Sequence, residues 1–191
     1  MKQHTQNHFK SIIIGAGASG LMCAEHISDS GSVLILEKQP QIATKVKVSG
    51  GGKCNFTNLG VSDQNYLSAN KHFVKSALAR FRPQDILKIM QQNRLNYEER
   101  QNRQIFAFNA SDVADMLLKR CLAKQVKIQT NCNIKNISKE NNVFKIETNF
   151  AVFTSDYLIV ATGGMSYSKI GATDSGYKIA RQVGHKIINP R

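Results

Sequence analysis

The chain has 191 residues, of which 41% are hydrophobic and 20% charged, enough apolar material for one substantial core. Its most apolar stretch, Ser11–Ala24, is interrupted by glycines, and no run approaches the roughly 20 apolar residues needed to cross a bilayer. The N-terminal residues are polar and lack the apolar region of a signal peptide. These features exclude a membrane span and predict a soluble, cytoplasmic protein.

The charge is strongly basic, with 26 Lys and Arg against 13 Asp and Glu and a formal net charge of +13. Nucleic-acid binders and anion sites have such a balance, and so do lysine-rich solvated surfaces. The cations are spread along the chain without a block of five or six like charges, which favours a solvated surface and predicts no nucleic-acid partner. The four cysteines form no C-x-x-C pair and have no histidines at zinc spacing, so we expect reduced thiols and no metal site.

The first predicted elements form a βαβ unit. Lys10–Ile14 is a β-branched run typical of a buried parallel strand, Ser19–Ser28 predicts a helix, and Ser32–Glu37 predicts the next strand. Together they span about 30 residues, the length of a right-handed crossover. A glycine-rich loop over Gln41–Asn58 is expected to follow.

The rest of the chain predicts helices and then short strands. The expected helices are Lys71–Ala79, Pro83–Gln92, one that opens at Ser111, and Gly176–Val183. The expected strands are Val126–Thr130, Ile134–Ser138, Val143–Glu147, Ala151–Thr154 and the buried Tyr157–Ala161, with a hairpin turn at Glu140–Asn142. This order predicts an α/β, Rossmann-like FAD/NAD(P)-binding fold with a parallel core sheet, a helical insertion and a small antiparallel β-meander.

The strongest motif is the G-x-G-x-x-G pattern of residues 15–20, which lies between a predicted strand and a predicted helix. Gly15 permits a tight turn, Gly17 lets backbone N–H groups approach a pyrophosphate, and Gly20 lets helix and strand pack closely. Glu37 ends the second strand and is placed to accept hydrogen bonds from the adenosine ribose. A carboxylate there disfavours NADP, because it would repel the 2′-phosphate. The motif by itself leaves NAD and FAD open.

Three stretches carry a resemblance to a known family. The first joins Ile12–Ala24 to Val33–Lys38, the second is SGGGKCNFTN over Ser49–Asn58, and the third is Ala161–His185. Together they resemble the bacterial flavoproteins of the YhiN/BaiN type, also called the aminoacetone-oxidase-like FAD-binding family. The second is close to the family's most distinctive motif, which usually has Arg where Lys53 stands here. Ala43 stands where the family often has Gly, so one phosphate or flavin contact differs.

The resemblance implies FAD bound in an extended form across the nucleotide-binding domain. The glycine loop would meet the pyrophosphate, Glu37 and Lys38 would flank the ribose, and the backbone of Ile134 would contact adenine. Lys45 and the loop Ser49–Asn55 would lie near the flavin. The cofactor-binding residues expected are Gly15, Gly17, Ala18, Ser19, Gly20, Glu37, Lys38, Lys45, Ser49, Gly50, Gly51, Gly52, Lys53, Cys54, Asn55, Ile134, Ala161, Thr162 and Gly163.

No catalytic side chain is identified. Cys54 is better interpreted as a small packing residue than as a redox thiol, and His185 as a structural histidine at a helix end. In flavoenzymes the cofactor carries the redox chemistry, so a flavin-dependent oxidoreductase that uses NAD(P)H or oxygen needs no triad. A dinucleotide-binding module without redox activity is the alternative. A basic nucleic-acid-binding protein would need aromatic platforms or a basic helix, and neither is recognised here.

Members of this family are about twice as long as the chain. We therefore expect residues 1–191 to form one FAD/NAD(P)-binding domain that is incomplete, the family's insertion domain and C-terminal return segment being absent. The substrate is not predicted. The chain by itself is expected to bind FAD weakly and to turn over no substrate, as a truncated fragment would.

Overall fold

The computed structural model of the chain describes residues 7–165, 171 and 173–188. Contacts divide the chain into two compact units, the first formed by residues 1–45 and 117–191 and the second by residues 46–116. Each unit is described by itself below. Residues 166–170 and 172, part of the third stretch that carries the resemblance, lie outside the described residues.

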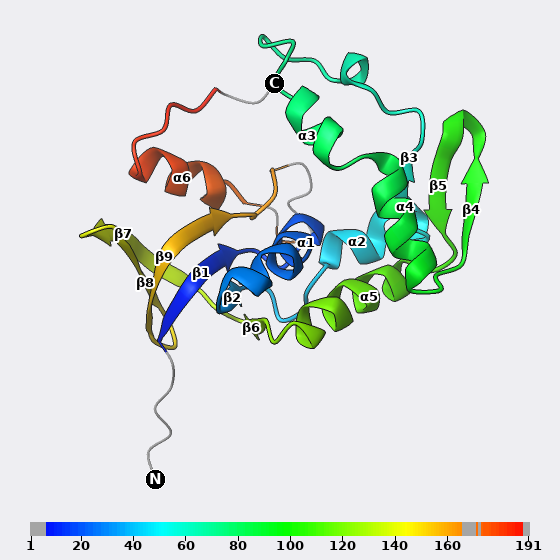
Figure 1. The fold of residues 1–191 in the computed structure, drawn as a ribbon. Coiled ribbons are helices and arrows are strands. Elements are labelled where there is room, and N and C mark those ends of the chain that lie inside the picture. The colour runs from blue at the N-terminus through cyan, green and yellow to red at the C-terminus, as the bar shows by residue number, and fades with distance from the viewer. Residues whose placement is uncertain (1–6, 166–170, 172, 189–191) are drawn as a thin grey trace. The chain divides into compact units, whose positions relative to one another are not determined.

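A six-stranded sheet in the order β6-β2-β1-β9-β8-β7 forms the centre of the first unit (Figure 1). Its strands are β1 (His8–Ile14), β2 (Val33–Leu36), β6 (Lys127–Gln129), β7 (Ile134–Glu140), β8 (Val143–Thr148) and β9 (Val152–Val160). The neighbours β6, β2, β1 and β9 run parallel, with Ile13 paired to Ile35 on one side and to Ile159 on the other. β8 and β7 continue the sheet antiparallel. The α/β class with a parallel core and a small meander is confirmed.

The strand β9 corrects one expected boundary. The two strands predicted over Ala151–Thr154 and Tyr157–Ala161 are a single strand that pairs with β8 and with β1. The polar residues between them resemble a turn in the sequence, but the Asp156 carboxylate points outward to the Lys10 ammonium at 2.9 Å. The predicted hairpin tip is correct, since Asn141 and Asn142 both have positive φ.

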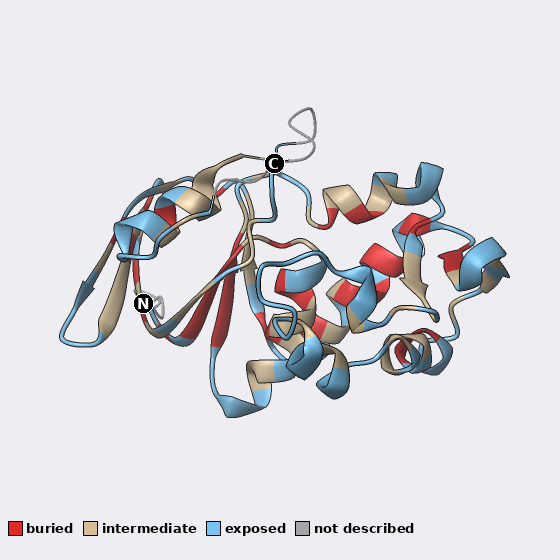
Figure 2. Cartoon of the chain, turned by 90° about the horizontal axis from the view of Figure 1, so that it is seen from above, coloured by how far each residue is buried: buried red, intermediate tan, exposed pale blue. Residues whose placement is uncertain are grey.

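The core of the first unit lies on its parallel strands. All four residues of β2 are buried, and Ile12 and Ile13 of β1 are fully buried. Figure 2 shows this as buried stretches along neighbouring strands. Burying each such aliphatic side chain contributes about 1.5–3 kcal/mol, which explains why β-branched runs in the sequence become these strands.

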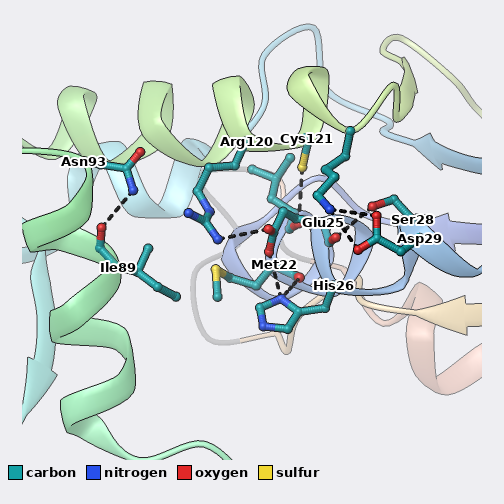
Figure 3. Close-up of polar contacts among 11 residues, drawn as sticks. Met22, Glu25, His26, Ser28, Asp29, Ile89, Asn93, Arg120 and Cys121 are labelled. Atoms are coloured by element: carbon teal, nitrogen blue, oxygen red, sulfur yellow. Dashed lines mark hydrogen bonds and ion pairs between the residues drawn. The ribbon is translucent and has the colours of Figure 1, made fainter.

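Two helices of this unit are held together by polar contacts (Figure 3). They are α1 (Ala18–Ile27), followed by the short η1 (Ser28–Ser30), and the C-terminal half of α5 (Ala110–Ala123), which begins in the second unit. The Arg120 guanidinium lies 2.9 Å from the Glu25 carboxylate, and the Cys121 thiol donates to the Leu21 carbonyl at 3.2 Å. α6 (Ser175–Gln182) buries Ile179 in the core that Ile12 and Leu36 share.

The second unit contains a three-stranded antiparallel sheet in the order β3-β5-β4, which the sequence did not predict. Its strands are β3 (Asn55–Asn58), β4 (Tyr97–Arg100) and β5 (Gln104–Ala107). Its helical elements are the end of α2 (Thr44–Val48), η2 (Ser49–Gly52), η3 (Asp63–Asn65), α3 (Lys75–Arg80), α4 (Pro83–Gln92), η4 (Gln101–Arg103) and the start of α5. The expectation of a long loop over Gln41–Asn58 is therefore wrong, because β5 supplies a partner strand from far along the sequence.

Among the described residues, no helix combines the length and hydropathy that a bilayer crossing requires.

Candidate cofactor site

The three glycines of the loop between β1 and α1 differ in the space around them. Gly15 has φ +107°, and a Cβ there would lie 2.5 Å from the carbonyl oxygen of Ala161. A Cβ on Gly20 would collide with the carbonyl oxygen of Gly15. A Cβ on Gly17 would meet nothing within 4 Å. The outer glycines thus permit close packing, and the middle one opens space over the loop.

The N-terminus of α1 lies beside that space. Within the described residues, no side chain caps the helix, and its first turn contains no acid. Ala18 and Ser19 are exposed, and the N–H of Leu21 makes the first helical hydrogen bond, to the Gly17 carbonyl at 3.0 Å. The first N–H groups of a helix and its dipole favour an anion, so this terminus can hold a phosphate.

Glu37 follows β2 at the same edge of the sheet, since carboxyl ends of parallel strands meet there. One carboxylate oxygen accepts the N–H of Ala16 at 2.7 Å, and the other accepts the N–H of Gln39 at 2.7 Å. The sequence motif predicts a contact between Glu37 and the ribose, but it does not predict the hydrogen bond from the glycine loop to Glu37. Each oxygen has a second lone pair that can accept a ribose hydroxyl.

A cavity of about 340 Å³ lies at this edge, entirely within the first unit. It brings together five of the residues predicted to bind cofactor, namely Gly15, Glu37, Lys38, Ile134 and Thr162. Gln39 and one face of α6 line it too, and neither was among the residues predicted to bind the cofactor. The α6 residues and their neighbour are Thr173, Ser175, Lys178, Ile179 and Gln182.

The start of the third resembling stretch, just after β9, is tied to both the sheet and α2. The Ala161 N–H donates to the Ile14 carbonyl at 2.8 Å, which continues the β1–β9 pairing beyond the strand. The Lys45 ammonium donates to the Gly164 carbonyl at 3.1 Å. Lys45 therefore lies beside the Thr162–Gly164 loop, and its ammonium has further donors for an acceptor there.

The loop Ser49–Asn55 belongs to the second unit. Gly50, Gly51 and Gly52 all have positive φ, which only glycine adopts at low cost, so the loop is a defined turn and not an extended linker. The Cys54 N–H donates to the Ser49 carbonyl at 2.9 Å. Cys54 is buried, and burial raises the pKa of its thiol, which argues against a reactive thiolate.

Metal chemistry has no support in the part of the chain that the structure describes, because no three His, Cys, Asp or Glu side chains come together there. His185, interpreted above as a structural histidine, is exposed just beyond α6, where its backbone N–H donates to the Ala180 carbonyl at 2.9 Å.

Known proteins place these features in a family. The family model described as HI0933-like protein Rossmann domain matches residues 9–190. The chain belongs to the HI0933-like Rossmann domain family. Membership confirms the predicted YhiN/BaiN-type family and the predicted Rossmann-like fold.

Curated relatives of this HI0933-like chain differ in their names. A ribosomal RNA dihydrouridine synthase of Haemophilus influenzae is 39% identical over 197 residues, which cover 100% of this chain and 48% of that protein. A 3-dehydro-bile acid delta(4,6)-reductase of Clostridium scindens is 28% identical, over 92% of this chain and 44% of that protein. The chain spans about half the length of these relatives.

The fold is also found among solved structures. THI4 of Thermovibrio ammonificans matches with a TM-score of 0.61 and 14% identity, over 95% of this chain and 65% of that one. At this identity the match concerns the fold alone.

Proposed function

We propose that this chain is the FAD-binding part of a flavin-dependent reductase. The observation that carries the proposal is the cavity at the carboxyl ends of β1 and β2, which joins Gly15 to Glu37 beside the uncapped N-terminus of α1. The HI0933-like family and the flavoprotein motifs of the sequence support FAD as the dinucleotide. FAD, when bound, would supply the hydride-transfer chemistry.

The residues of the first unit fit that group. The open space over Gly17 and the N–H groups of the first turn of α1 would hold the pyrophosphate. Glu37 would accept hydrogen bonds from the adenosine ribose while it keeps the loop in place, with Lys38 beside it and Ile134 next to the adenine. Lys45 would add positive charge at the Thr162–Gly164 loop.

The names of the relatives indicate one kind of reduction. Dihydrouridine is uridine with its C5–C6 double bond saturated, and a delta(4,6)-reductase acts on carbon–carbon double bonds as well. In the substrates that these names describe, the double bond is conjugated to a carbonyl, which is the kind of bond that accepts a hydride. The greater identity is to the synthase that acts on ribosomal RNA. We therefore propose that the whole protein reduces uridine in ribosomal RNA, with NAD(P)H as the donor.

RNA as the substrate gives the net charge of +13 a role. An RNA substrate is the opposite of the expectation, drawn from the spread of the cations alone, that nucleic acid is not a partner. The remaining part of such a protein would complete the substrate side. The 191 residues alone are still expected to bind FAD weakly and to reduce nothing.

The test has two stages. Titration of the purified chain with FAD, followed by flavin fluorescence and calorimetry, should show saturable binding that NADP does not compete away. The full-length protein, loaded with FAD and given NADPH or NADH, should add two hydrogens to a uridine of ribosomal RNA, detected by mass spectrometry of nucleosides. A chain that stays free of flavin at saturating FAD, or a full-length flavoprotein that leaves RNA unchanged, would refute the corresponding stage.

A further inference from the structure

A long exposed segment stands out in the second unit, and we name residues 62–82 the basic arm. It runs from the end of the β3 region through α3 to the start of α4 (Figure 1). Only Asp63, Val74 and Leu78 are half-buried, and every other side chain of the arm is exposed. α3 buries none of its residues. A helix with no buried face gains little from its own unit, so something other than core packing accounts for these side chains.

Large apolar groups are among the exposed side chains of the arm. Leu67 is 101% exposed, Phe73 is 73% exposed and Tyr66 is 47% exposed. Single exposed apolar residues are ordinary, but several on one short segment mark a contact surface.

Local hydrogen bonds hold the backbone that carries them. The Asn65 side-chain oxygen accepts the N–H of Ser62 at 2.8 Å, and the Asn70 side-chain oxygen accepts the N–H of His72 at 2.9 Å. The Phe73 N–H donates to the Asn70 carbonyl at 3.0 Å. The rings thus lie on turns that are already formed, which lowers the entropy cost of ordering the arm when a partner binds.

The charge of the arm is one-sided. It contains the cations Lys71, Lys75, Arg80 and Arg82 and a single acid, Asp63. Lys75 lies 3.5 Å from Asp63, and Arg82 lies 3.4 Å from Asp85 just beyond the arm. Such exposed pairs are weak, so a phosphate can compete for both cations.

Within the described residues, Lys71 and Arg80 make no recorded ion pair. Lys75 and Arg82 also border a shallow hollow of about 440 Å³, together with Ser62, Leu78 and Gln84.

We propose that the basic arm docks an unpaired segment of the RNA substrate. The proposal rests on the proposed function, because it takes from there that the substrate is RNA. Exposed rings beside unpaired cations are the combination that binds single strands, since rings stack on splayed bases and cations meet phosphates. A second copy of this chain would need an acidic surface opposite the arm, and this chain carries 26 basic against 13 acidic residues.

The test uses the 191-residue chain and a fluorescein-labelled oligouridine of about 12 nucleotides, within the site sizes of single-strand binders. Fluorescence anisotropy gives the dissociation constant at several salt concentrations. The double variant Tyr66→Ala with Phe73→Ala should bind at least about tenfold more weakly, with its salt dependence unchanged. The double variant Lys71→Gln with Arg80→Gln should lower the slope of log affinity against log salt by about 1.4.

Matched controls come from the first unit, outside the basic arm. Phe150→Ala removes a ring that is 55% exposed, and Lys119→Gln removes an exposed cation, and both should bind the oligouridine as the wild type does. Circular dichroism of each variant verifies the fold, which surface substitutions should leave intact.

The outcomes separate this proposal from the proposed function. Arm variants with wild-type affinity and salt slope would overturn the arm and leave RNA binding to another surface. A wild-type chain that binds no oligouridine even at low salt would also overturn it, while FAD titration of the same sample still reports on the cofactor. A wild-type dimer that Phe73→Ala dissociates in ultracentrifugation, with RNA affinity unchanged, would assign the surface to a second copy instead.

Discussion

The sheet of the first unit and the basic arm of the second use apolar residues in opposite ways. Ile35 of β2 is fully buried between β1 and β6, whereas Leu67 of the arm is fully exposed. The difference shows that hydrophobicity indicates a core only where a partner element exists, and that an ordered segment without one indicates a surface for something else.

The largest expected effect tests this difference between the sheet and the arm directly. Ile35→Ala should lower the free energy of unfolding by about 2–5 kcal/mol, because it leaves a cavity in the sheet core. Leu67→Ala should change it by less than about 0.5 kcal/mol, because the side chain already lies in water. Urea denaturation followed by circular dichroism measures both. Equal losses in the two variants would mean that the arm is packed as a core is.

The second prediction compares two glycines of the glycine loop. Gly20 is needed for close packing, and Gly17 leaves space for a ligand. Gly20→Ala should cost about 1–3 kcal/mol of stability, because its Cβ would meet the Gly15 carbonyl. Gly17→Ala should cost under about 1 kcal/mol, since its Cβ meets nothing, yet it should weaken FAD binding by filling the space over the loop. Denaturation and FAD titration are run on the same two variants. FAD affinity that survives Gly17→Ala would remove the loop from the proposed cofactor site.

A third prediction concerns pH and the buried contact between α1 and α5. Burial, and then the nearby Glu25 carboxylate, raise the pKa of the Cys121 thiol to about 11. The unfolded chain loses this proton near pH 9 and the folded chain only near pH 11, so the folded form is favoured less as pH rises through that window. The loss should reach about 2 kcal/mol.

Comparison of the wild type with Cys121→Ala isolates this effect. Urea denaturation at pH 8 and pH 10.5 should show a steeper fall for the wild type, since the variant has no thiol to titrate at that position. Parallel falls in the two proteins would show that Cys121 does not carry the pH dependence.

The smallest predicted effect compares a half-buried ion pair with an exposed one. Arg120→Met should cost about 1–2 kcal/mol, because the Glu25 carboxylate, 14% exposed, loses the guanidinium 2.9 Å away. Lys145→Met at the exposed Lys145–Glu147 pair should cost close to nothing. Thermal or urea denaturation of both variants gives the difference, and a larger cost at Lys145 would reverse the interpretation.

Elements with strong local signals were predicted well. Lys10–Ile14 and Ser32–Glu37 became β1 and β2 because consecutive aliphatic residues can be buried on both faces of a parallel sheet. Pro83–Gln92 is α4 with the predicted bounds, since proline fits the first turn of a helix. These signals lie within a few residues of one another, so no distant partner is needed to interpret them.

Elements that depend on distant partners were not predicted. β3 is a strand because β5, some fifty residues later, pairs with it. β4 contains Glu98 and Glu99 and shows little strand character by composition. Likewise α6 was expected as a helix, but its place in the cavity was not. Lys178 and Gln182 line the cavity with Glu37 because α6 packs on the sheet.

The sequence by itself determined the βαβ unit, the close packing at Gly15 and Gly20 and the position of Glu37, because each follows from backbone sterics and short spacing. Tertiary structure decided the hydrogen bond from the Ala16 N–H to Glu37, the α6 wall of the cavity and the exposure of the basic arm. These depend on which surfaces meet across long stretches of chain, and the burial of a side chain is a property of its neighbours in space and not of its neighbours in sequence.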